Sequence, residues 1–390
     1  MNSSYLGISA SDLTRRGGIH TAREIAGQPD LWSAVWDALQ QSYGSIRLFI
    51  DDFIARRECD IILTGAGTSA FIGEILAGWL DGTTGLRFRA AATTDIVTHP
   101  HLVLNRTRPT LLVSFARSGN SPESVATMEL ANQLCRNVAH LVITCNPEGQ
   151  LVKRISSNNG VSFLLPPEAD DKSLAMTGSF TAMTFAGLIL LGGMPLESMQ
   201  SAVKNFVEYG KYFFTHFLPG LRNLADSSFH RAVFLGSGPM QGSACESHLK
   251  LQELTDGHVI CKFDSFLGFR HGPKAVINRD TLNVFLFSSD QYVSLYEADL
   301  VSDINRSEKG LFRLGISEQK LKRADLDLNI YFTEKATRIS EPLLAIVSVL
   351  PAQVLGFFKS LALGLMPDTP SVSGTITRVV QGVHIYDYKL

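Results

Sequence analysis

One pattern occurs twice in this chain: a short apolar run, a Gly-x-Gly turn and then a helical stretch. The apolar runs are residues 60–64 in the first copy and 232–235 in the second. A further apolar run that leads into serines follows each copy, at residues 111–115 and 283–287, and the interval from turn to serines is the same in both. Equal spacing of the same elements indicates an internal repeat. Because strands that alternate with helices form parallel sheets, we predict an α/β protein with two tandem doubly wound domains.

The repeat divides the chain into parts of ordinary domain size. A length of 390 residues is enough for two domains, each with its own buried core. Trp32, Trp36 and Leu39 have helical spacing ahead of the first copy, and another helical stretch separates the two copies. The predicted parts are an N-terminal helical appendage (residues 1–45), a first α/β domain (46–200), a connecting helix (201–224) and a second α/β domain (225–390).

The composition argues against several classes of function. Apolar residues make up 45% of the chain, and a formal net charge of −2 offers no basic field for nucleic acid or an anionic membrane. The five cysteines are scattered without Cys-x-x-Cys spacing, which argues against disulfides and a metal site. No signal peptide is apparent, and the most apolar stretch, residues 185–194, is too short to cross a bilayer. We therefore expect a cytoplasmic protein.

The first glycine turn fits the dinucleotide-binding pattern, with Gly65, Gly67 and Ala70 at the three fingerprint positions. A nicotinamide cofactor is nevertheless the less favoured interpretation. No acidic residue follows the next strand at the expected spacing, and Thr68 and Ser69 place hydroxyl groups where a pyrophosphate site relies on bare backbone. We therefore expect this turn to hold no cofactor.

The loop of residues 117–121 reads Arg-Ser-Gly-Asn-Ser and precedes Pro122. Ser121 is suited to the N-cap of a helix and proline to its first position. Backbone N–H groups at such a helix start form an anion site, and Ser118, Asn120 and Ser121 add side-chain donors. A capped turn without a ligand is the alternative, although it does not account for the whole polar cluster. The second copy keeps only Ser-Ser-Asp here, so we expect it to have lost phosphate binding.

The helical stretch of the second copy carries charged side chains at helical spacing. Glu246, Lys250 and Glu253 stand at i, i+4 and i+7 and share one face. Spacing alone slightly favours a solvated charged stripe, but the helix follows a strand end, where open α/β sheets place their ligand crevice. His271 lies in the predicted loop of residues 269–273 and is a candidate acid–base group, although a structural histidine is the commoner case.

With these residues in view, the chain resembles the sugar isomerase (SIS) superfamily across nearly its whole length. Within it, the resemblance is to the agaS-type galactosamine-6-phosphate deaminase/isomerases, long labelled tagatose-6-phosphate ketose/aldose isomerases. The isomerase half of glucosamine-6-phosphate synthase is the relative whose mechanism corresponds best to the residues of this sequence. The stretches that carry the resemblance are ILTGAGTSAFIGEI, SFARSGNSPESV, LGSGPMQGSACESHLKLQELTDG, GFRHGPKA and DTPSVSGTITRVVQGV.

The resemblance implies roles for particular residues. The residue matching Glu253 moves a proton between C1 and C2 of the sugar, and the one matching Lys250 assists it. The residue matching His271 opens the sugar ring, and in the synthase it reaches in from the neighbouring subunit, which implies a homodimer with shared active sites. Arg378 stands where the synthase has a Schiff-base lysine. Because arginine stays protonated, we expect Arg378 to stabilise an anionic intermediate. The implied substrate-binding residues are Gly67, Thr68, Ser69, Arg117, Ser118, Gly119, Asn120 and Ser121.

The resemblance also implies a reaction, the conversion of galactosamine 6-phosphate to tagatose 6-phosphate and ammonia in amino-sugar catabolism. The chain starts at Met1 without a glutaminase domain, so we expect deamination to be the favoured direction. Glu168 and Asp171 are candidates for a lid beside the substrate amine. Two alternatives stay open: an aldose–ketose isomerase that releases no nitrogen, and a phosphosugar-sensing binding module. The sequence does not distinguish galacto from gluco substrates.

Overall fold

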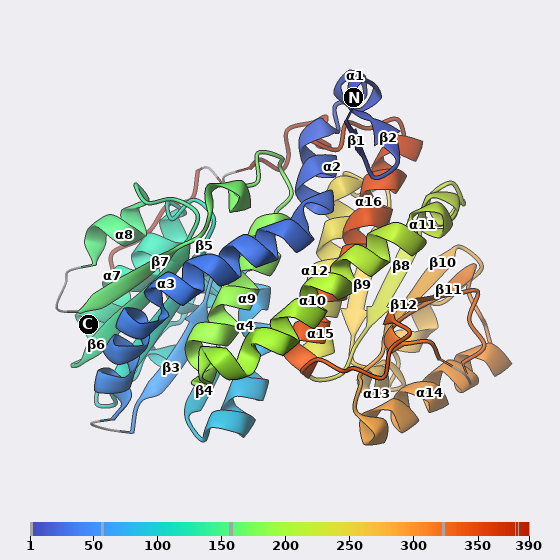
Figure 1. Ribbon diagram of the computed structural model, residues 1–390. Coiled ribbons are helices and arrows are strands. Elements are labelled where there is room, and N and C mark those ends of the chain that lie inside the picture. The colour runs from blue at the N-terminus through green and yellow to red at the C-terminus, as the bar shows by residue number, and fades with distance from the viewer. Residues whose placement is uncertain are drawn as a thin grey trace. The chain divides into compact units, whose positions relative to one another are not determined.

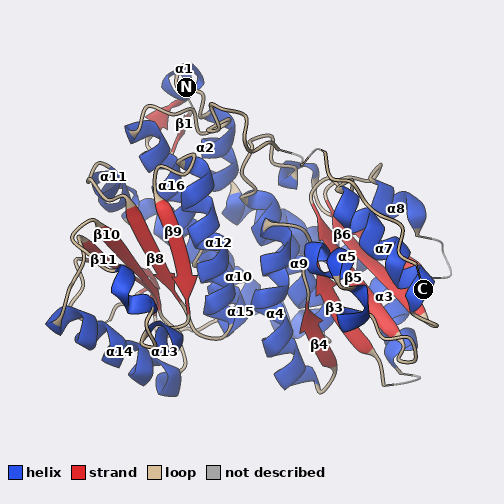
Figure 2. Ribbon diagram, turned by 180° about the vertical axis from the view of Figure 1, so that it is seen from behind, coloured by secondary structure: helices blue, strands red, loops and turns tan. Residues whose placement is uncertain are grey.

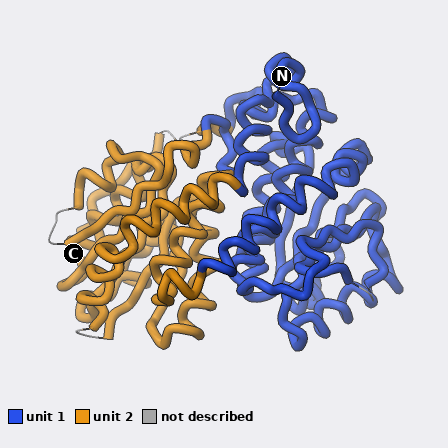
Figure 3. Tube along the Cα trace, in the orientation of Figure 1, with its two compact units in different colours: residues 1–29, 172–177, 200–375 blue, residues 30–171, 178–199, 376–390 orange. Residues whose placement is uncertain are grey.

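The computed structural model describes residues 3–55, 58–155, 159–321, 324–378, 380 and 382–389. The chain forms two compact units, which Figure 3 distinguishes by colour. Each unit contains one five-stranded parallel sheet (Figure 1). Unit 1 consists of Met1–Pro29, Lys172–Thr177 and Gln200–Thr375, and unit 2 of Asp30–Asp171, Gly178–Met199 and Ile376–Leu390.

The sheet of unit 2 has the strand order β4-β3-β5-β6-β7. Every residue of the central strand β5 is buried, as expected for a parallel strand covered on both faces. Helix α4 contacts α9 and strand β3, and α7 contacts α5 and β5. The strands are β3 (Asp60–Thr64), β4 (Arg87–Ala90), β5 (Thr110–Ala116), β6 (Val138–Thr144) and β7 (Gly160–Leu164). The helices of this region are α4 (Thr68–Thr84), α5 (Thr93–Thr98), α6 (Pro100–Val103), α7 (Pro122–Leu134), α8 (Gln150–Arg154), η1 (Pro167–Ala169) and α9 (Gly178–Gly192).

The sheet of unit 1 repeats this order as β9-β8-β10-β11-β12, with all neighbouring strands parallel (Figure 2). The predicted internal repeat and the predicted class, two tandem doubly wound α/β domains, are therefore confirmed. The strands are β8 (Arg231–Leu235), β9 (Ile260–Asp264), β10 (Thr281–Leu286), β11 (Phe312–Gln319) and β12 (Leu328–Thr333). The helices are α12 (Pro239–Leu254), α13 (Phe266–Phe269), η2 (Pro273–Val276), α14 (Gln291–Arg306), α15 (Glu341–Val347) and α16 (Leu350–Ala362).

Helices also precede the first sheet and connect the two copies. The N-terminal region is helical after a short hairpin, and its last helix continues past residue 45 without a break. The connecting region contains two helices rather than one. These elements are β1 (Ser4–Tyr5), β2 (Ile8–Ser9), α1 (Ala10–Arg15), α2 (Ile19–Ala26) and α3 (Gln28–Ile54), and then α10 (Leu196–His216) and α11 (Leu218–Ala225).

The two glycine turns have the same backbone geometry. Gly67 has φ 55° and ψ −129°, and Gly238 has φ 55° and ψ −130°. Only glycine adopts such angles without steric cost. A Cβ at Gly65 or Gly236 would lie 2.5 Å or 2.2 Å from atoms of the following helix. The glycines are therefore required for the tight strand-to-helix connection in both copies.

The apolar segment of residues 341–362, which comprises α15 and α16, is the one candidate membrane span among the described residues, and its most apolar 18-residue stretch is entirely buried within the fold. Helix α12, which carries the predicted catalytic residues, packs against both α15 and α16. A fully buried apolar helix is typical of the core of a large domain. Helices α15 and α16 therefore form the buried layer against which α12 packs.

Gly356 allows α16 to approach α12 closely. A Cβ at this position would lie 2.9 Å from Leu254 Cδ1 and 3.2 Å from the carbonyl oxygen of Lys250. Gly356→Val is therefore expected to destabilise the protein by about 1–3 kcal/mol, the usual cost of overpacking. Gly78→Val in α4 is the control, because a Cβ there meets no neighbour within 4 Å in the described part of the chain. Urea unfolding followed by circular dichroism measures both, and equal effects would contradict the close packing.

Candidate functional site

The predicted phosphate loop follows β5 and leads into α7. Ser121 occupies the N-cap position with φ −61° and ψ 135°, and Pro122 is the first helical residue, as predicted. The Ser121 side chain makes no capping hydrogen bond, and its Oγ donates to Ser124 Oγ at 2.6 Å. The N–H groups of the first turn therefore receive no acceptor from the N-cap side chain. Such groups at a helix N-terminus suit an anionic ligand.

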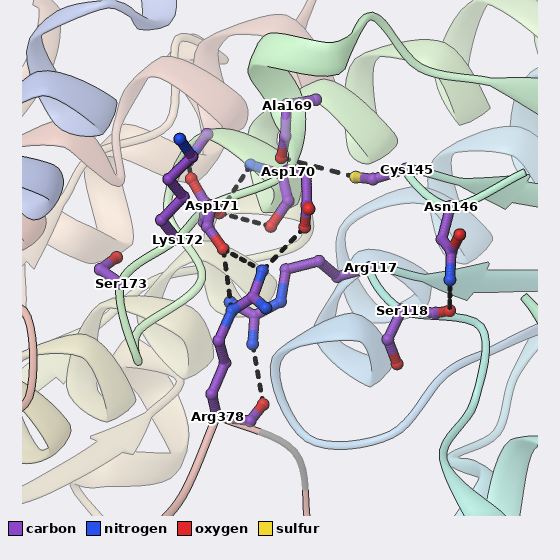
Figure 4. A network of polar contacts seen from close by, with 12 residues as sticks. Arg117, Ser118, Cys145, Asn146, Ala169, Asp170, Asp171, Lys172, Ser173 and Arg378 are labelled. Atoms are coloured by element: carbon purple, nitrogen blue, oxygen red, sulfur yellow. Dashed lines mark hydrogen bonds and ion pairs between the residues drawn. The ribbon is translucent and has the colours of Figure 1, made fainter. Parts of the chain in front are cut away.

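The loop backbone is held by the segment that follows β6. Asn146 Nδ2 donates to the Ser118 carbonyl at 2.8 Å (Figure 4), and the Leu151 N–H donates to the Gly119 carbonyl at 3.1 Å. The Asn120 Oδ1 accepts from the N–H of Gln150 at 2.9 Å, so this side chain also orders the loop. Sequence reasoning did not find Asn146, because its partner lies 28 positions away.

The Ser118 hydroxyl accepts a hydrogen bond and donates none to a described residue. Its Oγ accepts from the N–H of Asn120 at 3.3 Å, and the residue is partly exposed. Thr68 and Ser69 lie at the start of α4 and are buried, directly after the Gly67 turn. These hydroxyl groups follow the carboxyl ends of β3 and β5, which are neighbouring strands. The structure therefore places them at one edge of the sheet, where open α/β folds bind ligands.

Arg117 and Arg378 lie together, as Figure 4 shows. The Arg117 side chain is buried, and its Nη2 donates to the Arg378 carbonyl at 2.8 Å. Burial lowers the pKa of Arg117. The Arg378 guanidinium donates in turn to the Asp171 carbonyl and to Asp170 Oδ1, the latter at 2.9 Å. Arg117 thus joins the loop after β5 to the C-terminal segment, and Arg378 joins that segment to the one before α9. The roles of both arginines toward a substrate stay predictions.

Asp171 does not form the lid that its sequence position suggested. Its carboxylate is buried at the start of α9, where it accepts from the N–H groups of Gly178 at 3.1 Å and Ser179 at 2.9 Å. A carboxylate at a helix N-terminus satisfies N–H groups that would otherwise lack an acceptor. The side chain of Asp171 is therefore used in the fold and is not free to contact a substrate amine.

Two of the three charged residues on one face of α12 are buried, and the third is partly exposed. Lys250 Nζ lies 2.5 Å from Glu253 Oε2 and 3.5 Å from Glu246 Oε1, which confirms that the three share one face. The side chains of Glu246 and Lys250 are 0% and 1% exposed, whereas that of Glu253 is 23% exposed. The alternative of a solvated charged stripe is therefore wrong. Because burying charges costs free energy, such a set inside a fold is a candidate for function, and only Glu253 has access to solvent.

His248 stands next to this set and was not singled out in the sequence. Its Nδ1 donates to the carbonyl of Cys245, and its ring centroid lies 4.9 Å from that of Phe263. Burial lowers its pKa, which favours the neutral imidazole. The residue is two positions from Glu246 and therefore off the face that the i, i+4 spacing defines. The i, i+4 and i+7 spacing therefore does not identify His248 as a neighbour of the charged set.

His271 lies in the turn between α13 and η2, and its side chain is exposed. Lys274 Nζ and Arg270 Nη1 approach the Asp303 carboxylate at 2.6 Å and 3.7 Å and anchor the two sides of this turn. The His271 ring has no hydrogen bond within the part of the chain that the structure describes. It is therefore available to a ligand or another chain.

In the second copy, carboxylates occupy the position of the phosphate loop. Asp290 caps α14 by accepting from the N–H groups of Tyr292 at 2.7 Å and Val293 at 3.1 Å. Glu297 accepts from the Ser288 N–H at 3.0 Å, and burial raises its pKa to about 7. With its helix start already occupied by an acidic group, this copy is unsuited to a phosphate, in agreement with the sequence.

Ser118→Ala is expected to weaken binding of hexose 6-phosphates by about 1.5–3 kcal/mol, the scale of a hydrogen bond to a charged group. The loop itself should persist, because its other contacts do not use this hydroxyl. Calorimetric titration with a hexose 6-phosphate measures the change. Ser294→Ala, at a partly exposed serine of α14 in the second copy, serves as control. Unchanged affinity in Ser118→Ala would mean that the loop is a capped turn and no phosphate site.

The duplicated sheet, the paired glycine turns and the serine loop define a protein built from SIS domains, and residues 54–191 match the SIS domain family. A curated relative from Shewanella sp. (strain ANA-3), named D-galactosamine-6-phosphate deaminase AgaS, is 38% identical over 99% of this chain and 96% of its own length. The chain therefore belongs to the AgaS family of SIS-domain proteins. The family resemblance drawn from the sequence motifs is confirmed.

Solved structures agree with this assignment. A crystal structure from Clostridium novyi NT has a TM-score of 0.96 at 37% identity and covers 100% of both chains. The crystal structure of tagatose-6-phosphate ketose/aldose isomerase from Escherichia coli has a TM-score of 0.85 at 35% identity, and the match covers 96% of this chain and 98% of that one. The shared fold thus extends through both SIS domains.

Proposed function

We propose that this protein converts galactosamine 6-phosphate and water to tagatose 6-phosphate and ammonia. The observation that carries the proposal is the buried Glu246–Lys250–Glu253 set, in which one carboxylate reaches solvent. A proton must move between two carbons in this reaction, and a carboxylate held by a lysine is a suitable acid–base group. The 38% identity to a relative named D-galactosamine-6-phosphate deaminase supports the choice of substrate.

In this proposal the phosphate group binds at the start of α7. Ser118 donates its hydroxyl hydrogen, the N–H groups of the first helical turn of α7 face the anion, and Thr68 and Ser69 add hydroxyl groups from the adjacent strand end. Gly67 and Gly119, both with positive φ, let the backbone turn without a side chain in the way. Phosphate binding fixes one end of the sugar and orients its C1 and C2 atoms for the chemistry.

The chemistry follows from one proton transfer. His271 assists opening of the sugar ring, which gives a C1 aldehyde with an amine on C2. Glu253 removes the C2 proton, which leaves an enolate oxygen at O1 and the amine on C2, and returns the proton to C1. O1 gains a proton and the amine nitrogen loses one in the same step. The product is a C2 ketimine, and water adds to its carbon and displaces ammonia, so that C2 becomes the ketone of tagatose 6-phosphate. Lys250 orients the Glu253 carboxylate, and Arg378 stabilises the negative charge of the enolate oxygen.

We propose further that the protein is a cytoplasmic homodimer with shared active sites. The exposed ring of His271, on a turn anchored at both sides, is the observation that favours this arrangement. In a two-fold dimer each chain would contribute this histidine to the site of its partner.

A second candidate is an aldose–ketose isomerase that acts on tagatose 6-phosphate without releasing nitrogen. The observation in its favour is the 35% identity to the Escherichia coli protein described as a tagatose-6-phosphate ketose/aldose isomerase. The same proton transfer between C1 and C2 would serve both reactions. They differ only in whether C2 carries an amine or a hydroxyl group.

Free ammonia distinguishes the candidates. The enzyme is expected to release ammonia from galactosamine 6-phosphate but not from its N-acetyl form, because an acylated nitrogen does not readily form a hydrolysable imine. Glucosamine 6-phosphate assayed alongside reports the preference at C4. Turnover of tagatose 6-phosphate without ammonia from either amino sugar would favour the isomerase. Equal turnover of the N-acetyl sugar would also contradict the deaminase proposal.

A further inference from the structure

A polar pocket of about 590 Å³ lies in unit 2, at the amino-terminal edge of its sheet. The side chains that line it come from the starts of β3 and β4, from the segment before β5 and from the C-terminal segment. Pockets of this volume are typical of small-molecule sites. The charged residues in its lining are Asp60, Arg87, Arg89, Arg106 and Arg108, with His101 beside them.

This pocket is separate from the phosphate loop. Arg108 precedes β5 and Ser118 follows it, and β5 is seven residues long. At about 3.3 Å per residue, the two ends of this strand are about 20 Å apart. A ligand in the pocket therefore occupies the opposite edge of the sheet from a substrate phosphate.

The pocket has an excess of positive charge. The Asp60 carboxylate lies 3.3 Å from Arg87 Nε and 3.1 Å from Arg108 Nη1, so two guanidinium groups share one carboxylate. Among the described residues, Arg89 Nη1 donates to a backbone carbonyl at 3.0 Å and forms no ion pair. The Arg106 side chain makes no hydrogen bond or ion pair with the described residues. The four arginines and one aspartate that line the pocket therefore leave a net excess of three positive charges.

The backbone that carries Arg106 and Arg108 is ordered by a local turn. The Oδ1 atom of Asn105 accepts from the N–H groups of Thr107 at 2.9 Å and Arg108 at 3.2 Å, which fixes the turn that carries Arg106. Tyr388 also lines the pocket and packs against the apolar cluster that contains Leu104. The site therefore combines charged side chains with the aromatic ring of Tyr388.

We propose that this pocket binds a phosphorylated small molecule with two or more negative charges. Guanidinium groups bind phosphate oxygens through paired N–H donors, and a multiply charged anion would balance the unpaired arginines. The Tyr388 ring would contact the part of the ligand that carries no phosphate.

The test is calorimetric titration of the full chain with inorganic pyrophosphate, in a Ser118→Ala background that weakens the phosphate loop. Adding Arg106→Ala is expected to weaken pyrophosphate binding at least tenfold, about the effect of losing one charge-assisted hydrogen bond. Arg106→Gln should act alike, because it keeps a polar N–H donor on a shorter side chain and loses the charge. Arg279→Ala, at an arginine whose side chain is 92% exposed outside the pocket, is the control and should change nothing.

A hexose bisphosphate and a nucleoside diphosphate, titrated in the same way, distinguish the natural sources of such an anion, and tighter binding of either identifies the ligand class. Loss of pyrophosphate binding on Ser118→Ala alone would place the anion in the phosphate loop and overturn the proposal. Equal affinities in Arg106→Ala and Arg279→Ala would also overturn it, as would the absence of saturable binding below about 10 mM.

Discussion

Glu253→Gln is expected to lower kcat by about 10²–10⁴-fold, the usual contribution of general acid–base catalysis. The amide has the shape of the carboxylate but cannot take up the C2 proton. Affinity for hexose 6-phosphates should stay nearly unchanged, because phosphate binding is proposed for the loop after β5. Steady-state kinetics with galactosamine 6-phosphate give kcat, and titration with a non-reacting hexitol 6-phosphate gives the affinity.

Glu208→Gln is the matched control for this substitution. Glu208 lies on α10, its side chain is 56% exposed, and it pairs with Lys211 at 3.3 Å. Losing that surface pair should leave kcat unchanged. If Glu253→Gln kept its turnover, the buried set on α12 would have a structural role only, and the proton transfer would have to be assigned to another group.

A mixture of two inactive variants is expected to recover activity if the sites are shared. Glu253→Gln and His271→Asn are prepared separately, then unfolded and refolded together in equal amounts. In a hybrid dimer with shared sites, one site collects both substitutions and the other has neither. With random pairing about half the dimers are hybrids, so about a quarter of all sites should be native. The measured activity should approach a quarter of that of refolded wild type.

The two arrangements of the site give different results in this experiment. If Glu253 and His271 of one chain serve the same site, no site is repaired and the mixture stays as inactive as its components. Wild-type protein taken through the same unfolding and refolding shows whether the procedure itself restores activity. Absence of recovery beside a fully active control would rule out the shared site.

The sequence by itself determined the elements of this protein and their order. The predicted strand of residues 60–64 coincides with β3, and that of 232–235 lies within β8. The glycine turns and the common face of Glu246, Lys250 and Glu253 were also predicted from the sequence. These features are local: they depend on backbone angles that one residue type permits and on the 3.6-residue period of a helix. A second copy of the same pattern made the fold class predictable as well.

Only the tertiary structure decided how the charged and polar side chains are used. Arg117 donates to the Arg378 carbonyl, 261 positions along the chain, and neither residue carries a local sign of the other. Asp171 was a candidate for a lid, yet its carboxylate holds the start of α9. The burial of Lys250, which separates a candidate catalytic set from a solvated stripe, follows from helices packed around α12. Charge burial and long-range hydrogen bonds depend on which segments exclude water from one another, and no local spacing encodes that.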